Sequence, residues 1–172
     1  MLRASNITRG GLFAALSLIF IYLSSIAPTN KLALLTLSSF MIISSILIMG
    51  IKSSLILYIS VSMLSFFLLA SKGIAVVYLM FFGAYGFIKY YIEKLNKLPL
   101  EIALKLLFFN SSLGILFLLY DTLFISLVDL SKIKFSIYLV ILVLQIAFLI
   151  YDYILTLFIS YFNNKLYNRF MK

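Results

Sequence analysis

Six long apolar runs separated by short polar segments limit the folds that are open to this chain. They cover residues 11–27, 32–49, 53–70, 74–91, 100–128 and 135–162. A helix needs about 20 apolar residues to cross roughly 30 Å of hydrocarbon, because each residue adds about 1.5 Å. A soluble domain is excluded, since only 11% of the 172 residues are charged and such domains carry about 25%. We therefore predict an all-α, polytopic integral membrane protein with six transmembrane helices in a single transmembrane domain, residues 1–172.

The distribution of basic residues predicts how these spans are oriented. Cytoplasmic segments of membrane proteins carry an excess of Lys and Arg. With the N-terminus inside, the outer loops hold Lys31, Lys72, Lys132 and Lys134. The inner segments hold twice as many, namely Arg3, Arg9, Lys52, Lys94, Lys97, Lys165, Arg169 and Lys172. We therefore expect a multi-pass protein of the cell membrane with both termini in the cytoplasm. Because the cations are spread over the loops, the net charge of +9 indicates this bias rather than nucleic-acid binding.

The residue types that the chain lacks exclude several kinds of chemistry. It contains no His and no Cys, so imidazole and thiolate ligands for metals and the common catalytic triads are missing. Its five Asp and Glu residues form no paired-carboxylate motif. No glycine-rich phosphate-binding loop is present either. We therefore expect no enzymatic activity and no cofactor or metal.

The densest polar cluster lies between the fourth and fifth apolar runs. Lys89 and Glu93 are four residues apart, and so are Glu101 and Lys105. This spacing predicts an ion pair on one face of each helix, and the short loop between them places the two pairs opposite each other. Pairing matters because a charge at the centre of the bilayer costs about 2.5–3.5 kcal/mol. The cluster is either a clamp that fixes this hairpin or a cytoplasmic docking patch for a partner protein.

The fourth run combines small residues with aromatic ones. Gly83 and Gly86 lack side chains, so we expect a neighbouring helix or a ligand to approach closely there. Tyr78, Phe81 and Tyr85 recur at helical spacing and form an aromatic stripe. Such a stripe is usually packing or an interfacial belt. The alternative is one wall of a pocket for a flat ligand.

Small residues also open the first run. Gly10 with Ala14, and Gly11 with Ala15, are each four residues apart. Pairs of this kind let a second helix pack backbone to backbone in a membrane.

The chain resembles the substrate-binding S component of energy-coupling factor (ECF) transporters. The resemblance rests on six spans, two cytoplasmic termini, a basic N-terminus and the small residues that open the first span. In that family an A-x-x-x-A face on the first span meets the coupling helices of the transmembrane T component. The matching positions are Gly11, in place of the first alanine, and Ala15. Residues 81–93 and 105–110 also resemble a group of S-component-like Firmicute membrane proteins. The resemblance covers about residues 8–125 and includes no signature for biotin, riboflavin or thiamine.

The resemblance implies an S-component-like bundle that captures a small molecule, such as a vitamin or its precursor, from outside. Its partners would be a T component and cytoplasmic ATPases, with Gly11, Ala14 and Ala15 as the coupling face. A cavity open to the outer leaflet would lie beneath the loop around Pro28–Lys31. Its expected lining residues are Tyr22, Asn30, Tyr78, Asn110, Tyr120 and Asp121. The alternative is a non-transporting scaffold of the MreD type, similar in size and in its six spans, that engages cell-wall machinery.

Overall fold

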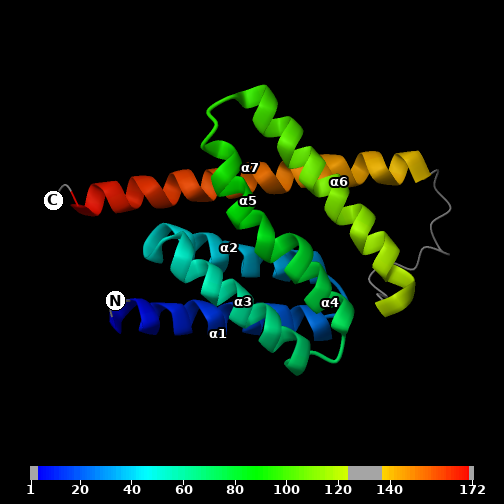
Figure 1. The fold of residues 1–172 in the computed structure, drawn as a ribbon, viewed down its shortest axis with the longest axis horizontal. Helices are drawn as coiled ribbons and strands as arrows, with labels where there is room; N and C mark the ends of the chain where they lie inside the picture. Colours follow the sequence, from blue (N-terminus) through cyan, green and yellow to red (C-terminus); the bar gives the residue numbers. More distant parts are fainter. Residues whose placement is uncertain (1–3, 124–136, 171–172) are drawn as a thin grey trace. The chain divides into compact units, whose positions relative to one another are not determined.

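The computed structural model describes residues 4–123 and 137–170, and the side chains of residues 7–119 and 139–164. All regular secondary structure in these ranges is helical, as predicted (Figure 1). The elements are α1 (Ala4–Ile26), α2 (Lys31–Met49), α3 (Ile51–Leu68), α4 (Lys72–Val77), the π-helix η1 (Tyr78–Gly83), α5 (Ala84–Glu93), α6 (Leu98–Leu123) and α7 (Ile137–Phe170).

Six helical stretches of the described chain are long and apolar enough to cross a membrane. They are Ile7–Ile26, Lys31–Met49, Ile51–Leu68, Lys72–Glu93, Leu98–Leu119 and Leu139–Asn164. Each corresponds to one predicted apolar run, with its ends shifted by a few residues. The predicted end of the fifth run at Val128 and the start of the sixth at Phe135 lie outside the described residues. These helices mark the chain as a multi-pass membrane protein.

The chain forms two compact units. The first, Met1–Val128, contains α1 to α6, and the second, Asp129–Lys172, contains α7. Helix α7 has 34 residues, which corresponds to about 50 Å at 1.5 Å per residue. It is therefore longer than the roughly 30 Å of hydrocarbon that one span crosses. That all of these helices belong to a single transmembrane domain stays a prediction.

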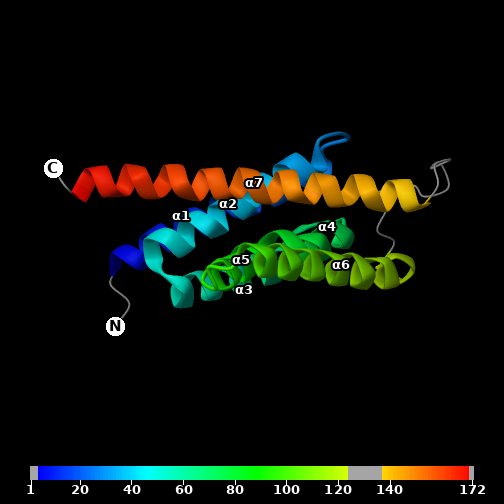
Figure 2. The same ribbon diagram turned by 90° about the horizontal axis from the view of Figure 1, so that it is seen from above.

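In the first unit, α1, α2 and α3 pack against one another. The fourth span consists of α4, η1 and α5 in succession, and it contacts α2, α3 and α6. Seen from above, α1 and α2 form one layer, and α3, α5 and α6 form a second (Figure 2). The largest fully buried side chains of this unit are Ile21, Leu35, Ile42, Val61, Ile74, Tyr78, Tyr85 and Lys89. The core is therefore apolar apart from two tyrosines and one lysine among these large side chains.

Serine is the residue that brings the first three helices close together. Ser17, Ser24, Ser38, Ser39, Ser45, Ser54 and Ser65 are all fully buried. Small residues allow close approach of helix backbones where no hydrophobic force acts between helices. The hydroxyls of Ser38 and Ser45 donate to the carbonyls of Leu35 and Ile42 in their own helix, each at 2.7 Å. The hydroxyls of Ser38 and Ser45 are therefore satisfied within their own helix.

Short turns make α1, α2 and α3 antiparallel neighbours in chain order. Asn30, just before α2, has φ 63°, in the left-handed region. The Ser24 hydroxyl crosses this turn and donates to the Lys31 carbonyl at 3.0 Å. Gly50 alone joins α2 to α3 with φ 80°, which a residue without Cβ adopts at little cost. The turn at Gly50 places the start of α3 beside the start of α1.

Candidate functional site

A single carboxylate joins α5 to α6. Glu93 Oε1 lies 2.6 Å from Lys89 Nζ on the same helix and 2.9 Å from Lys105 Nζ on α6. Both lysines are buried, with side chains 1% and 8% exposed, whereas the Glu93 side chain is 30% exposed. We call these three residues the lysine–glutamate cluster. The predicted pair between Lys89 and Glu93 is confirmed, and the cluster ties the two helices together.

The structure differs from the prediction in the partner of Lys105. Its ammonium group contacts Glu93 on the neighbouring helix, and Glu101 forms no ion pair with any residue whose side chain is described. Glu101 lies in the first turn of α6, where the helix dipole favours a negative charge. Lys105 is one turn further along, at the level where α5 and α6 pack. Antiparallel packing, rather than spacing along the sequence, therefore selects its partner.

The π-helix buries Tyr78 completely against α3. The ring centroids of Tyr78 and Tyr58 are 6.4 Å apart, and Tyr58 lies 5.6 Å from Phe87. The Tyr78 hydroxyl has no hydrogen-bond partner in the described part of the chain. A buried hydroxyl without a partner costs about 1–3 kcal/mol. Tyr78 therefore carries an unused hydrogen-bonding group in the middle of the fourth span.

Tyr58 of α3 contacts the fourth span at the point where the helix changes geometry. Its hydroxyl donates to the Leu79 carbonyl within η1 at 2.7 Å. Its ring covers Gly83, where an added Cβ would lie 2.6 Å from Tyr58 Cε2. At Gly86 a Cβ would lie 3.1 Å from Ile43 on α2. The expected close approach of neighbouring helices at both glycines is confirmed.

The sequence pattern did not single out Tyr58. Its position in the sequence could have identified it. Tyrosines in spans usually lie at the membrane interfaces, whereas Tyr58 lies in the middle of α3. A tyrosine at that depth needs a partner for its hydroxyl. The carbonyl of Leu79 supplies it.

The aromatic stripe of the fourth span divides between two neighbours. Phe81 and Tyr85 stack on Phe108 of α6, with ring centroids 6.2 and 5.9 Å away. Tyr78 instead faces Tyr58 on α3. A π-helix has more residues per turn than an α-helix, so positions that would share one α-helical face separate around the axis. Phe81 and Tyr85 are packing residues.

The other predicted substrate-lining residues are either exposed or have side chains outside the described part of the chain. Tyr22 is 51% exposed, Asn30 is exposed at the turn before α2, and Asn110 is exposed on α6. The Asn110 amide donates to the Leu106 carbonyl of its own helix at 2.9 Å. The side chains of Tyr120 and Asp121 lie outside the described part. That these residues line a cavity open to the outer leaflet stays a prediction.

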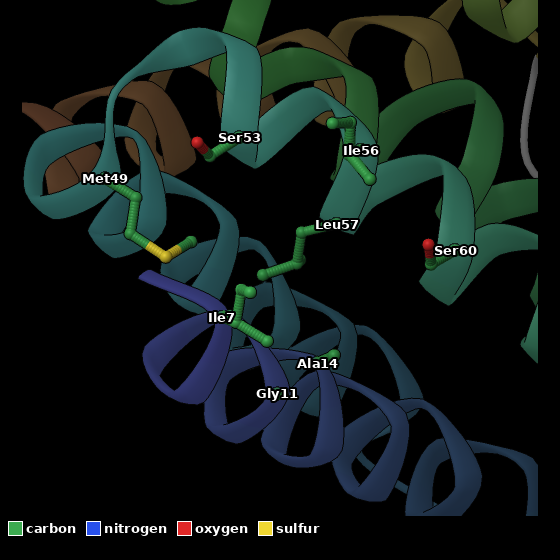
Figure 3. A pocket seen from close by; sticks show the side chains of 9 residues that line it. Ile7, Gly11, Ala14, Met49, Ser53, Ile56, Leu57 and Ser60 are labelled. Carbon is green, nitrogen blue, oxygen red and sulfur yellow. The ribbon is translucent and has the colours of Figure 1, made fainter. Parts of the chain in front are cut away.

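A cavity of about 340 Å³ lies between α1 and α3 beside the end of α2 (Figure 3). We call it the α1–α3 groove. It exists because three small residues on α1 leave the space beside α3 unfilled: at Gly11, for example, an added Cβ would meet no atom within 4 Å. None of the described side chains that line it is charged. The lining residues are Ile7, Gly10, Gly11, Ala14, Met49, Ser53, Ile56, Leu57 and Ser60.

Two of the three predicted coupling residues line this groove. They are Gly11 and Ala14, whereas Ala15 is exposed outside it. Among the described side chains of α1, those of Ser17, Ile21 and Ser24 are buried; they are three or four positions apart, so they share a different side of the helix. Gly11 and Ala15 are therefore not used for packing inside the bundle.

Comparisons with protein-family models, with curated proteins and with solved structures find no match. The geometry of the chain itself therefore carries the functional argument. Its three distinctive features are the lysine–glutamate cluster, the π-helix beneath Tyr58, and the small-residue side of α1 with its groove.

Proposed function

We propose that the chain is the membrane-embedded substrate-capture subunit of an ECF-type importer for a small molecule, such as a vitamin or its precursor. One observation carries this proposal: the side of α1 with Gly11 and Ala15 is open. A Cβ at Gly11 would meet nothing within 4 Å, and Ala15 is exposed. Small residues on an open face of a span allow a second helix to pack closely. That second helix would belong to a T component.

In this proposal the chain binds the substrate and partner proteins hydrolyse ATP. Its sequence has no nucleotide-binding motif, so ATP hydrolysis would be supplied by cytoplasmic ATPases in the same complex. The chain would bind its substrate from outside, with both termini in the cytoplasm. Tyr78 supports this role, because its buried hydroxyl has no partner among the described residues and can hydrogen-bond a guest that reaches it. The lysine–glutamate cluster would hold α5 and α6 together as the complex changes shape.

The test is an assembly experiment with a matched control. Ala15→Leu fills the open face with a bulky side chain, and Ala103→Leu makes the same change at another exposed alanine, on α6. Wild type and Ala103→Leu should co-purify with a T component and ATPases from native membranes in mild detergent. Ala15→Leu should lose these partners while keeping the thermal stability of the isolated chain. Retention of the partners, or a loss of thermal stability, would contradict the assignment of this face.

A second measurement separates the importer subunit from a scaffold of the MreD type. The purified chain is heated with each member of a panel of vitamins and their precursors. An importer subunit should be stabilised by one compound or a closely related group. A scaffold should be stabilised by none and should co-purify with cell-wall proteins instead.

A further inference from the structure

The ring of Tyr58 occupies the place that a side chain at position 83 would take. A Cβ added at Gly83 would lie 2.6 and 2.8 Å from two atoms of this ring, Cε2 and Cδ2, and 3.1 Å from Cζ of Tyr78. The edge of the Tyr58 ring and the hydroxyl-bearing carbon of Tyr78 therefore meet above the backbone of Gly83. The missing side chain leaves room for one aromatic ring, and Tyr58 supplies that ring.

Tyr58 lies at the edge of the face by which α3 packs. Its side chain is only partly buried, and its neighbours Leu55 and Ile59 on α3 are exposed. Its hydroxyl holds the ring in place by donating to the carbonyl of Leu79 at 2.7 Å. Rotation about the Cα–Cβ bond to another staggered rotamer breaks this hydrogen bond and carries the ring away from Gly83. The fully buried side chains of the core need not move with it.

Next to the Tyr58 ring lies the unused hydroxyl of Tyr78. The Tyr78 side chain is fully buried, and its hydroxyl has no partner in the described part of the chain. It belongs to the π-helix η1, and π-helical turns within α-helices are frequent at functional sites. Once the Tyr58 ring has moved, two hydrogen-bonding groups border the space that it leaves. The Tyr78 hydroxyl can donate there, and the Leu79 carbonyl can accept.

We propose that Tyr58 is a displaceable lid and that a neutral planar ring of the imported molecule takes the place of its side chain. The ring accepts a hydrogen bond from Tyr78 and donates one to the Leu79 carbonyl. Its faces meet aromatic neighbours, since the Tyr58 ring that it replaces lies 6.4 Å from Tyr78 and 5.6 Å from Phe87. It is neutral, because a charge within a span is costly. This inference rests on the proposed substrate-capture role and names the chemical class of the substrate.

The experiment uses the full chain, purified in mild detergent, and small planar probes. The probes are the pyridones whose carbonyl lies next to the ring nitrogen or opposite it, which are neutral and carry an N–H donor and a carbonyl acceptor. Their N-methyl forms keep the acceptor and lack the donor. Saturation-transfer NMR gives the dissociation constants. Wild type should bind one of the pyridones roughly tenfold more tightly than its N-methyl form, through one additional hydrogen bond. No binding of either pyridone, or equal binding of both forms, would overturn the proposal.

Variants test the donor and the lid separately. Tyr78→Phe removes the donor and should weaken pyridone binding about tenfold. Tyr91→Phe is the matched control, because Tyr91 is an exposed tyrosine of α5, and it should bind like wild type. Tyr58→Phe keeps the ring and loses the hydrogen bond that holds it, so it should bind the pyridone roughly two- to tenfold more tightly. Detergent micelles take up the same amount of probe in every sample, so differences between variants report the site.

Two results with these variants would also overturn the proposal. One is wild-type affinity in Tyr78→Phe, which would place the pyridone away from this hydroxyl. The other is a Tyr58→Phe variant that binds no more tightly than wild type, which would make Tyr58 a fixed wall.

The importer assignment fails in a different measurement. If the pyridone results are as expected but no T component or ATPase co-purifies, the ring site stands and the chain is not an importer subunit. If these partners co-purify but Tyr78→Phe leaves pyridone binding unchanged, the importer assignment stands and the ring site is wrong.

Discussion

Replacing Glu93 by glutamine tests the lysine–glutamate cluster most directly, because this one carboxylate contacts both buried lysines. The substitution keeps the size of the side chain and removes its charge. Lys89 Nζ and Lys105 Nζ then face a neutral amide where they had a carboxylate oxygen at 2.6 and 2.9 Å. We therefore expect Glu93→Gln to destabilise the folded chain.

The size of the effect follows from burial. Removing one partner of a buried ion pair costs about 3–5 kcal/mol, whereas exposed pairs contribute about 0–1 kcal/mol. Glu93 is 30% exposed, its glutamine oxygen still accepts a hydrogen bond, and both lysines have at least one further interaction. The expected loss in the free energy of unfolding is therefore about 2 kcal/mol.

The assay is unfolding in mixed micelles of dodecyl maltoside and sodium dodecyl sulfate, followed by far-UV circular dichroism. Glu101→Gln is the matched control and should change the free energy of unfolding by less than about 0.5 kcal/mol, since Glu101 has no ion pair in the described part of the chain. Adding Lys89→Met to Glu93→Gln should recover part of the loss. Strictly additive losses, or an equal loss in Glu101→Gln, would refute the bridging role of Glu93.

Three further outcomes are expected. Gly83→Ala should lower the free energy of unfolding by about 1–3 kcal/mol, because the new Cβ would lie 2.6 Å from the ring of Tyr58. Gly114→Ala is the control: its Cβ would meet nothing within 4 Å, so it should be close to neutral in the same assay. Tyr78→Phe removes a hydroxyl that has no partner among the described residues, so the free energy of unfolding should stay the same or rise by no more than about 3 kcal/mol, the upper cost of an unpaired buried hydroxyl; a clear loss would mean that the hydroxyl is bonded. A cytoplasmic reporter fused after Lys172 should be active, and a tag within residues 129–134 should be labelled from outside the cell, whereas the opposite pattern would reverse the predicted orientation.

Long apolar runs and the residues that interrupt them were enough to predict the six helices. Hydropathy depends on composition within one segment, so it is readable before any packing is known. Gly83 and Gly86 were also correctly predicted as points of close approach, because a missing side chain has that effect whichever helix lies opposite.

Features that depend on contacts between helices were not predictable in the same way. Glu101 is four residues before Lys105 in the sequence, and this spacing favours an ion pair between them. Packing of the two helices instead places Glu93 beside Lys105, and this is the pair that forms. The π-helix has no marker in its own residues, because it accompanies the Tyr58 hydroxyl bond to Leu79. The small residues of α1 indicated a face for close helix packing, but only the packing of α3 determines that Gly11 and Ala14 line a groove while Ala15 does not.

The sharing of Glu93 also has a consequence for the order in which the chain enters the membrane. Lys89 and Glu93 lie on one helix, so the fourth span is neutral at that point as soon as it becomes helical. Lys105 lies on the next helix and gains its carboxylate only when α5 and α6 stand antiparallel. Before that moment the carboxylate within reach of its ammonium group is that of Glu101, four residues earlier on the same helix; without it the ammonium group must stay near water or bear part of the roughly 2.5–3.5 kcal/mol that a lysine costs at the bilayer centre. The fourth span can therefore insert alone, whereas the fifth is favoured to insert as a hairpin with it.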